Sequence, residues 1–220
     1  MRTARLVVFD LDGTLVDSVA DLTTAVNRML GDIAPGAGAL SHDEVRSFVG
    51  DGARELVARV LARSSARADL DEALATFLDF YRTGLLDATR PYPGVVQGLE
   101  RLSDRTLAVL TNKPGDMSRA ILEGLGLKTR FFRIYGGGDV PGKKPDPAGL
   151  KRLLAEAGVS PEEALMVGDS AVDVRTARNA GTPVAGVTYG LDPTGLRAAA
   201  PDLLVGSLEE LADRLETGQL

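Results

Sequence analysis

The sequence predicts an α/β fold in which helices cover both faces of a doubly wound parallel sheet, with a helical segment inserted near its start. Short apolar runs recur along the chain, and from about residue 94 they alternate with stretches of helical periodicity. Residues 16–87 break this alternation, because they contain helical patterns but no strong β-branched run. We therefore expect a core formed by residues 1–15 and 88–220, and a separate helical domain formed by residues 16–87.

Six apolar runs are interpreted as strands. In chain order they are Leu6–Phe9, Leu107–Leu110, Ile134–Tyr135, Ala164–Val167, Pro183–Val187 and Leu203–Val205. Consecutive apolar residues without alternation are typical of strands that are buried on both faces of a parallel sheet. Together with the helices between them, they indicate a Rossmann-like core.

Helices are expected between these strands and throughout the inserted segment. In the core they are Gly115–Leu125, Pro147–Ala157, Ala171–Ala180 and Leu208–Leu215, and residues 94–102 resume the strand-and-helix pattern. In the insertion they are Val19–Leu30, Asp43–Val49, Ala53–Leu61 and Leu70–Leu85. Glycines at 126, 158 and 181 mark three helix ends. The two linkers, near residues 14–18 and 86–92, would be hinges.

The composition of the 220 residues limits the possible classes of function. Cysteine is absent and there is one histidine, which excludes disulfides, zinc–thiolate sites and multi-histidine metal sites. A formal net charge of -6 argues against nucleic acid as the main partner. No apolar run approaches the ~20 residues of a membrane span, and none resembles a signal peptide. We expect a cytoplasmic monomer or homodimer that binds neither nucleic acid nor membranes.

Polar segments follow four of the predicted strands. They are Asp10-Leu11-Asp12-Gly13-Thr14, Thr111-Asn112-Lys113, Lys143-Lys144-Pro145, and Gly168-Asp169-Ser170 with Asp173 one turn later. Because ligands of doubly wound sheets bind beyond the carboxyl ends of the strands, these segments should meet in one crevice. Four clustered carboxylates would repel one another without a cation, and ligands that offer only oxygen suit a hard ion. We therefore expect Mg²⁺.

These motifs, in this order, resemble those of the haloacid dehalogenase superfamily of phosphatases. The resemblance covers most of the chain and implies a small helical cap, formed here by residues 16–87. It further implies a Mg²⁺-dependent phosphomonoesterase that acts on a small phosphorylated metabolite. The reaction would proceed through an aspartyl-phosphate intermediate.

The same resemblance implies a role for each motif residue. Asp10 would attack phosphorus, and Asp12 would protonate the leaving alcohol and then activate water. Thr111 and Lys144 would bind and neutralise the phosphoryl oxygens. The backbone N–H groups that complete the phosphate cradle would be those of Leu11 and Asn112.

A metal site is implied by the acidic residues of the first and last motifs. Asp10 and Asp169 would be direct ligands, and Asp12 would contribute its backbone carbonyl. Asp173 would act through water or by orienting Lys144. The metal would offset the repulsion between an anionic nucleophile and a dianionic ester.

The segment 49–56 is similar to the cap loop of bacterial phosphoglycolate phosphatases, and segments 111–114 and 187–190 also resemble that group. Gly50 and Gly52 would present free N–H groups to an anion at the start of a helix. Arg54 would bind a substrate carboxylate, although a solvated Arg54 is an equal alternative. The expected substrate is 2-phosphoglycolate.

Other functions stay open at this point. Pyrophosphate, a sugar phosphate or a nucleotide could be the substrate. A dehalogenase would lack Asp12, a phosphonoacetaldehyde hydrolase would need a lysine in the cap, and β-phosphoglucomutase-like mutases have valine in place of Thr14. A phospho-accepting signalling module and an inactive binding protein are the non-enzyme alternatives.

Four polar residues near the motifs have simpler interpretations. Ser170 is expected to cap a helix, and His42 to be solvated or to cap. Lys113 and Lys143 are expected to be solvated surface charges, although Lys113 could also contact phosphate.

Overall fold

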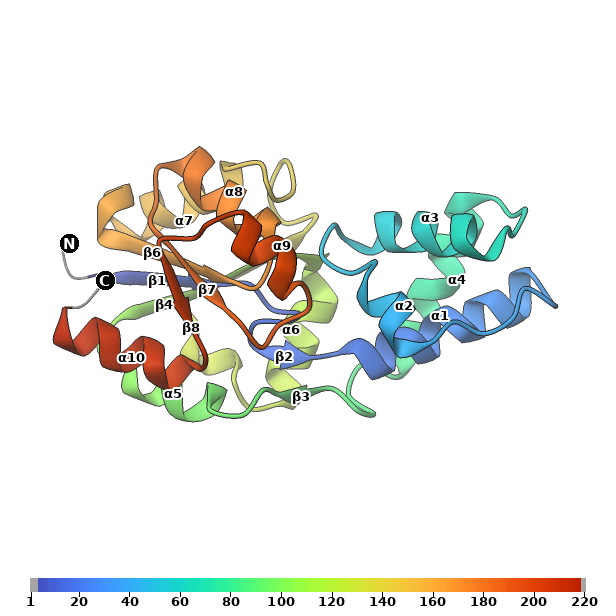
Figure 1. The fold of residues 1–220 in the computed structure, drawn as a ribbon, viewed down its shortest axis with the longest axis horizontal. Coiled ribbons are helices and arrows are strands. Elements are labelled where there is room, and N and C mark those ends of the chain that lie inside the picture. The colour runs from blue at the N-terminus through green and yellow to red at the C-terminus, as the bar shows by residue number, and fades with distance from the viewer. Residues whose placement is uncertain (1–3, 219–220) are drawn as a thin grey trace.

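The protein is described by a computed structural model over residues 4–218, and its core is a six-stranded parallel sheet (Figure 1). The strand order is β5-β4-β1-β6-β7-β8. Their bounds are β1 Leu6–Phe9, β4 Thr106–Pro114, β5 Arg133–Gly137, β6 Ala164–Gly168, β7 Val184–Val187 and β8 Leu203–Val205. All six predicted strands are confirmed, and the sheet is the expected α/β core.

The winding of the sheet reverses beside β1. From β1 the chain moves outward through β4 to β5, and then returns to the other side of β1 with β6. In register, Leu6 lies opposite both Thr106 of β4 and Ala164 of β6. Such a reversal leaves a crevice at the carboxyl ends of the central strands, which is where ligands of this architecture bind.

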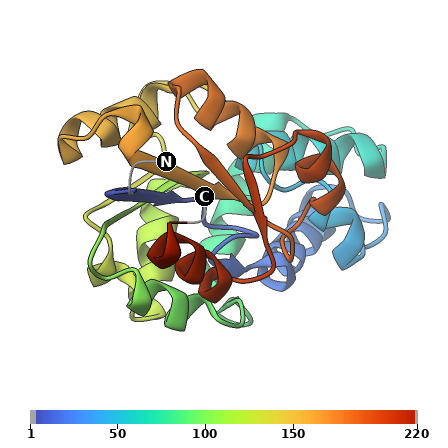
Figure 2. The same ribbon diagram turned by 60° about the vertical axis from the view of Figure 1, so that its left-hand side comes forward.

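Two helical layers bury the faces of the sheet (Figures 1 and 2). One layer contains α5 Val95–Arg101, α6 Gly115–Gly124 and α10 Leu208–Thr217; the other contains α7 Ala148–Ala157, α8 Ala171–Ala180 and α9 Pro193–Ala198. Alternate residues of β1 serve the two layers, since Val7 and Phe9 pack in the first cluster and Leu6 and Val8 in the second. Two short 3-10 turns, η1 Lys128–Arg130 and η2 Pro161–Glu163, connect elements of the core.

The predicted core helices are confirmed within a few residues. Gly158 and Gly181 end α7 and α8 in the left-handed conformation, with φ of 63° and 74°. Helix α9 was not predicted, because six residues are too few to show a periodicity.

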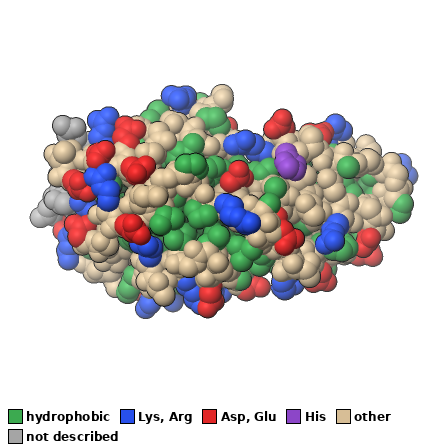
Figure 3. Space-filling model, turned by 90° about the horizontal axis from the view of Figure 1, so that it is seen from below, with side chains coloured by type: hydrophobic (Ala, Val, Ile, Leu, Met, Phe, Trp, Pro, Cys, Tyr) green, Lys and Arg blue, Asp and Glu red, His purple; other side chains and the backbone are tan. Residues whose placement is uncertain are grey.

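A helical insertion, residues 19–83, lies to one side of the sheet in Figure 1. It consists of α1 Val19–Ile33, α2 His42–Arg46, α3 Ala53–Ser64 and α4 Leu70–Thr83. The insertion has its own apolar cluster, in which Val26, Val57, Val60 and Phe77 are almost fully buried. Helix α2 is shorter than the predicted Asp43–Val49, and His42 begins it at the surface (Figure 3, purple).

Both connections to the insertion pass through a short ribbon. Strand β2 (Val16–Asp17) pairs antiparallel with β3 (Arg90–Pro91), so the two expected hinge regions lie side by side. Sequence patterns missed this ribbon because two residues per strand carry no alternation.

Figure 3 shows acidic and basic side chains interspersed over the face seen from below. Within residues 4–218, no helix is both long enough and apolar enough to cross a bilayer.

Candidate functional site

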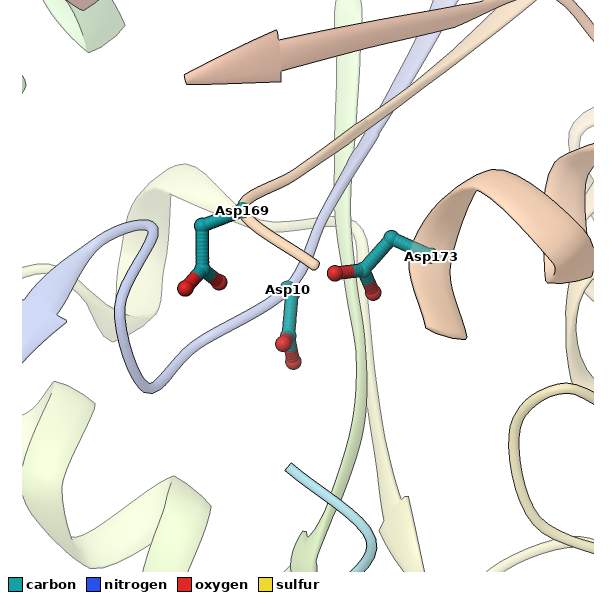
Figure 4. Close-up of side chains that lie close together, drawn as sticks. All are labelled: Asp10, Asp169 and Asp173. Atoms are coloured by element: carbon teal, nitrogen blue, oxygen red, sulfur yellow. The ribbon is translucent and has the colours of Figure 1, made fainter. Parts of the chain in front are cut away.

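Three buried carboxylates meet at the carboxyl ends of β1 and β6. Asp10 directly follows β1, Asp169 directly follows β6, and Asp173 lies in the first turn of α8. Figure 4 shows the three side chains converging from these separate elements. Each offers one oxygen, and these oxygens lie within 4.8 Å of one another. The sequence expectation that these motifs converge is therefore met for this acidic trio.

Lys144 places a buried ammonium group beside the three carboxylates. Its Nζ lies 2.8 Å from Asp10 Oδ1 and 2.7 Å from Asp173 Oδ1, and its side chain is 2% exposed. Asn112 holds the Lys144 backbone, because its Oδ1 accepts from the Lys144 N–H at 2.8 Å and its Nδ2 donates to the Lys144 carbonyl at 3.0 Å. The loop after β5 is thus attached to β4, which keeps the ammonium beside Asp10.

Asp169 and Asp173 are oriented by donors from neighbouring loops. The Thr14 hydroxyl donates to Asp169 Oδ1 at 3.1 Å, and the Leu191 N–H donates to Asp169 Oδ2 at 2.7 Å. Ser170 occupies the N-cap position of α8, as expected, and its N–H and hydroxyl both donate to Asp173 Oδ2. One oxygen of Asp173 is thereby committed to the helix start, and the other faces Lys144.

Burial and mutual repulsion perturb the charges of this site. Desolvation raises the pKa of Asp10 to about 6, with Lys144 opposing and Asp173 adding to the rise. Burial, followed by the charges of Asp173 and Asp10, raises the pKa of Asp169 well above its ordinary value. Burial acts to lower the pKa of Lys144, but Asp10 and Asp173 together raise it, so it stays protonated. One ammonium therefore contacts two of the three carboxyl groups, Asp10 and Asp173.

The trio has the chemistry of a site for a hard divalent cation. Asp10 Oδ1 is buried and has no hydrogen-bond partner among the described residues, since its contact with Lys144 lacks hydrogen-bond geometry. The remaining excess of negative charge would be costly in a buried site without a further cation. Because the side chains offer only carboxylate oxygens, they suit an ion such as Mg²⁺ or Ca²⁺.

Asp12 points away from this trio. Its Oδ1 accepts from the Ser18 hydroxyl at 2.5 Å, and Lys113 Nζ lies 3.1 Å from both of its oxygens. Asp10 and Asp12 are two residues apart and would share a face if the strand continued, but β1 ends at Phe9 and the chain bends at Leu11, so the two side chains face different partners. The Asp12 side chain lies beside the acidic trio without joining it.

The expectation that Lys113 is a surface charge is wrong. Its side chain is 3% exposed, because β4 continues to Pro114 and buries the residues that follow Thr111. The Thr111 hydroxyl, also buried, accepts from the Lys113 N–H at 3.3 Å. The extension of β4 beyond Leu110 contains no apolar run that would predict it. The position of Lys113 directly after Thr111 and Asn112 was the one sequence signal that it could lie in the site.

The loop of the insertion that carries Gly50 and Gly52 lies against the end of β4. Asn112 Nδ2 donates to the Gly50 carbonyl at 3.0 Å, and Lys143 Nζ donates to the Asp51 carbonyl at 3.0 Å. Both glycines have positive φ, 121° and 91°, and a Cβ on Gly52 would lie 3.1 Å from the Asn112 carbonyl oxygen. Lys143 is exposed as expected, but it also contacts the insertion.

Arg54 is not brought to this site. Its guanidinium forms an ion pair with Asp71 of α4, and its side chain is 52% exposed. The first turn of α3 directs it away from β4, so the solvated alternative describes its position in this structure. Gly50 and Gly52, in contrast, line a cavity of about 40 Å³ together with Asp10, Asp12 and Thr111.

A second opening reaches Asp10 and Asp169. This cleft, of about 470 Å³, is lined by Asp10 and Asp169 and also by Arg46, Arg59 and Arg175. Arg175 is exposed, whereas Arg59 is paired with Asp51 and Arg46 donates to the Gly190 carbonyl. Asp12, Asp51 and Asp192 also line this cleft, so the three arginines offset only part of its negative charge.

Gly13 makes the close approach of the first motif to Asp169 possible. Its φ is +87°, and a Cβ at this position would lie 2.3 Å from Asp169 Oδ2. We expect Gly13→Ala to displace Asp169, to lower the free energy of unfolding by about 1–3 kcal/mol through backbone strain, and to weaken metal binding. Urea denaturation and metal titration would measure both effects. Gly31→Ala, in an open helical position, is the control expected to be harmless.

Comparison with known proteins gives concordant matches. Residues 7–187 match the family model described as haloacid dehalogenase-like hydrolase. The chain is 42% identical to phosphoglycolate phosphatase of Pseudomonas putida, over 94% of this chain and 78% of that protein. It is also 42% identical to phosphoglycolate phosphatase 1 of Pseudomonas aeruginosa, over 96% and 79%. A crystal structure from Haemophilus somnus 129pt, described as a predicted phosphoglycolate phosphatase, superposes with a TM-score of 0.90 at 31% identity and covers 97% of this chain and 98% of that one.

Proposed function

The chain belongs to the haloacid dehalogenase-like hydrolase family, and on that premise we propose that it hydrolyses phosphate monoesters through a covalent intermediate on Asp10. The observation that carries this proposal is the buried Asp10 carboxylate, paired with Lys144 and grouped with Asp169 and Asp173 at the end of the central strand. A buried carboxylate whose Oδ1 lies beside the Lys144 ammonium and accepts no hydrogen bond from the described residues is suited to attack an electrophile that enters the crevice.

In the first half-reaction, an Asp10 oxygen attacks phosphorus and the bond from phosphorus to the alcohol oxygen breaks. Asp12 donates a proton to the departing alcohol, which leaves an aspartyl-phosphate on Asp10. Lys144 and the Thr111 hydroxyl stabilise the charge on the phosphoryl oxygens. The backbone N–H groups of Leu11 and Asn112 complete the cradle.

In the second half-reaction, Asp12 takes a proton from water, and the water oxygen attacks phosphorus. The bond to Asp10 breaks, inorganic phosphate leaves, and both aspartates return to their starting states. The position of the Asp12 side chain supports this role in proton transfer. Its contacts with Ser18 and Lys113 hold it next to Asp10, Asp169 and Asp173 but not among them.

Mg²⁺ is the proposed cofactor. Asp10, Asp169 and the Asp12 backbone carbonyl would hold it, with Asp173 acting through water or through Lys144. When bound, the ion would neutralise negative charge shared by the carboxylates and the phosphoryl group. The fit rests on the oxygen-only donor set and on Asp10 Oδ1, which accepts no hydrogen bond from the described residues although it lies beside Lys144.

The stabilisation of the protein by Mg²⁺ should depend on pH. Because the folded-state pKa values of Asp10 and Asp169 are raised, the folded metal-free protein binds more protons than the unfolded chain. Its stability therefore falls as pH rises from about 4 through about 6, and the ion must displace those protons to bind. We expect the increase in Tm on adding Mg²⁺ after EDTA treatment to be larger at pH 7.5 than at pH 5.5. An equal increase at both pH values would contradict this assignment.

We further propose that 2-phosphoglycolate is the main substrate and glycolate the product. The two Pseudomonas relatives are named for this activity, and the cavity of about 40 Å³ beside Asp12 favours a compact leaving group. A sugar phosphate, pyrophosphate or a nucleotide is the alternative.

Steady-state kinetics on a panel of phosphate esters with Mg²⁺ test the substrate. The highest kcat/KM is expected for 2-phosphoglycolate, and a higher value for a sugar phosphate or a nucleotide would refute that choice while leaving a phosphatase. Absence of phosphate release from every ester would refute the enzyme and favour a phospho-accepting module or an inactive binding protein.

The segment 16–87 is proposed to be a cap domain that closes over the crevice. An apolar cluster formed almost entirely by its own helices, and the paired connections at β2 and β3, support a unit that can move on the core. Polar contacts such as Lys113 with Tyr81 and Arg46 with Gly190 hold it against the core in this structure. Closure would exclude water and strengthen the charge interactions at Asp10. A cytoplasmic location and a monomeric or homodimeric state, both expected from the sequence, stay predictions.

A further inference from the structure

Lys113 is a buried cation that the proposed reaction does not use for phosphoryl transfer. It follows Thr111 by two residues on β4, and its Nζ lies 3.1 Å from each oxygen of Asp12. It lines the cavity of about 40 Å³ that Asp10 and Asp12 also line. It is the only lysine or arginine among the described residues that line this cavity.

Tyr81 adds a second polar group to the same wall. The Tyr81 hydroxyl, at the end of α4, accepts a hydrogen bond from Lys113 Nζ at 2.6 Å, and its ring stacks on Phe77 with centroids 5.7 Å apart. The tyrosine is almost fully buried, and its own hydroxyl proton has no acceptor among residues 4–218. Burial raises the pKa of Tyr81 to about 12, so the phenol keeps that proton. Because buried donors are normally hydrogen-bonded, we expect an atom of a ligand to accept the hydrogen bond from the Tyr81 hydroxyl.

The rest of the cavity wall on the insertion side is apolar. Leu22, Leu56 and Phe77 line it, so one ammonium and one hydroxyl stand in surroundings that would not solvate a charge. Burial acts to lower the pKa of Lys113, but the contacts with Asp12 and Tyr81 raise it, and the ammonium is retained. A cation and a free donor placed together in an apolar wall favour one small anionic acceptor.

We propose that Lys113 Nζ and the Tyr81 hydroxyl together bind a carboxylate carried by the leaving group of the substrate, one carbon away from the ester oxygen. The inference rests on the proposed phosphatase function, because Asp12 marks where the departing oxygen would lie. An atom bonded to the alcohol that Asp12 protonates is within reach of Lys113, which touches Asp12 directly. Arg54, the sequence candidate for this role, is instead paired with Asp71.

This placement divides substrate recognition between the core and the insertion. Lys113 belongs to β4, whereas Tyr81 belongs to α4, 32 residues away in the chain. The carboxylate subsite is therefore complete only when the insertion lies against the core as it does in this structure. A substrate with a carboxylate at this position would favour that arrangement over an open one.

The test compares two esters of similar size, 2-phosphoglycolate and 2-hydroxyethyl phosphate, in which a neutral hydroxymethyl group replaces the carboxylate. The measured quantity is the ratio of kcat/KM for the first ester to that for the second. Lys113→Gln should lower this ratio by about 10- to 100-fold, and Tyr81→Phe by about 3- to 10-fold, mainly through KM for 2-phosphoglycolate. Lys151→Gln, the same charge change on an exposed part of α7, should leave the ratio unchanged.

Each result has one meaning. A loss of kcat that is equal for both esters in both variants would show that Lys113 only positions Asp12, and would overturn the proposal. Tyr81→Phe keeps the ring and its stacking, so the kcat/KM ratio of this variant tests the proposal if Lys113→Gln does not fold. Wild-type turnover of both esters with a ratio near one would refute the carboxylate subsite alone. Wild-type turnover of neither ester, with turnover of another ester of the panel, would also refute the carboxylate subsite, whereas turnover of no ester at all would refute the phosphatase function from which the inference proceeds.

Discussion

Asp10→Asn is expected to abolish turnover, with a fall in kcat of at least about 10⁴-fold on any phosphate ester. The amide cannot form the acyl-phosphate bond, and it removes one anionic oxygen from the trio with Asp169 and Asp173. Phosphate release with saturating Mg²⁺ measures the loss. Retention of substantial activity would overturn the nucleophile assignment.

The same variant should fold at least as well as the wild type. At pH 7 the ionised Asp10 opposes folding, because its pKa rises to about 6 on burial. Replacing it with a neutral amide should increase the free energy of unfolding in EDTA by up to about 3 kcal/mol. Urea denaturation would therefore separate a chemical loss from a structural one. A large drop in stability would mean that the carboxylate supports the fold.

Lys144→Met is expected to lose both activity and stability. It leaves Asp10 and Asp173 buried without their shared cation, and breaking a buried ion pair from one side costs about 3–5 kcal/mol. We expect kcat to fall by at least about 10²-fold, because charge on the phosphoryl oxygens is no longer neutralised. Urea denaturation in EDTA and phosphate-release kinetics with Mg²⁺ would measure the two losses.

Lys143→Met is the matched control for this change. The neighbouring lysine is 53% exposed, and its polar contacts within residues 4–218 are with the Asp51 carbonyl and, more distantly, Glu55. Its removal should change stability by less than about 1 kcal/mol. Similar effects of the two substitutions would contradict the assignment of Lys144 as the buried cation of the site.

The local features of the sequence were sufficient for the core of the fold. Apolar runs such as Leu6–Phe9 are buried on both faces in the central strands β1, β6 and β7, so each of these runs identifies a strand without knowledge of its neighbours. The residues directly after these strands lie at one edge of the sheet by topology alone. Asp10 and Asp169 could therefore be placed together from sequence, although they are far apart in the chain.

The partners of the charged side chains around the acidic trio were decided only by the tertiary structure. Lys113 is buried because β4 extends beyond its apolar run and α4 brings Tyr81 against it, and neither fact has a local signature. Arg54 turns outward because Asp71 of a neighbouring helix pairs with it. Strand ends are determined by burial along the chain, whereas the partners of a long charged side chain depend on which elements pack around it. That packing is a property of the whole molecule.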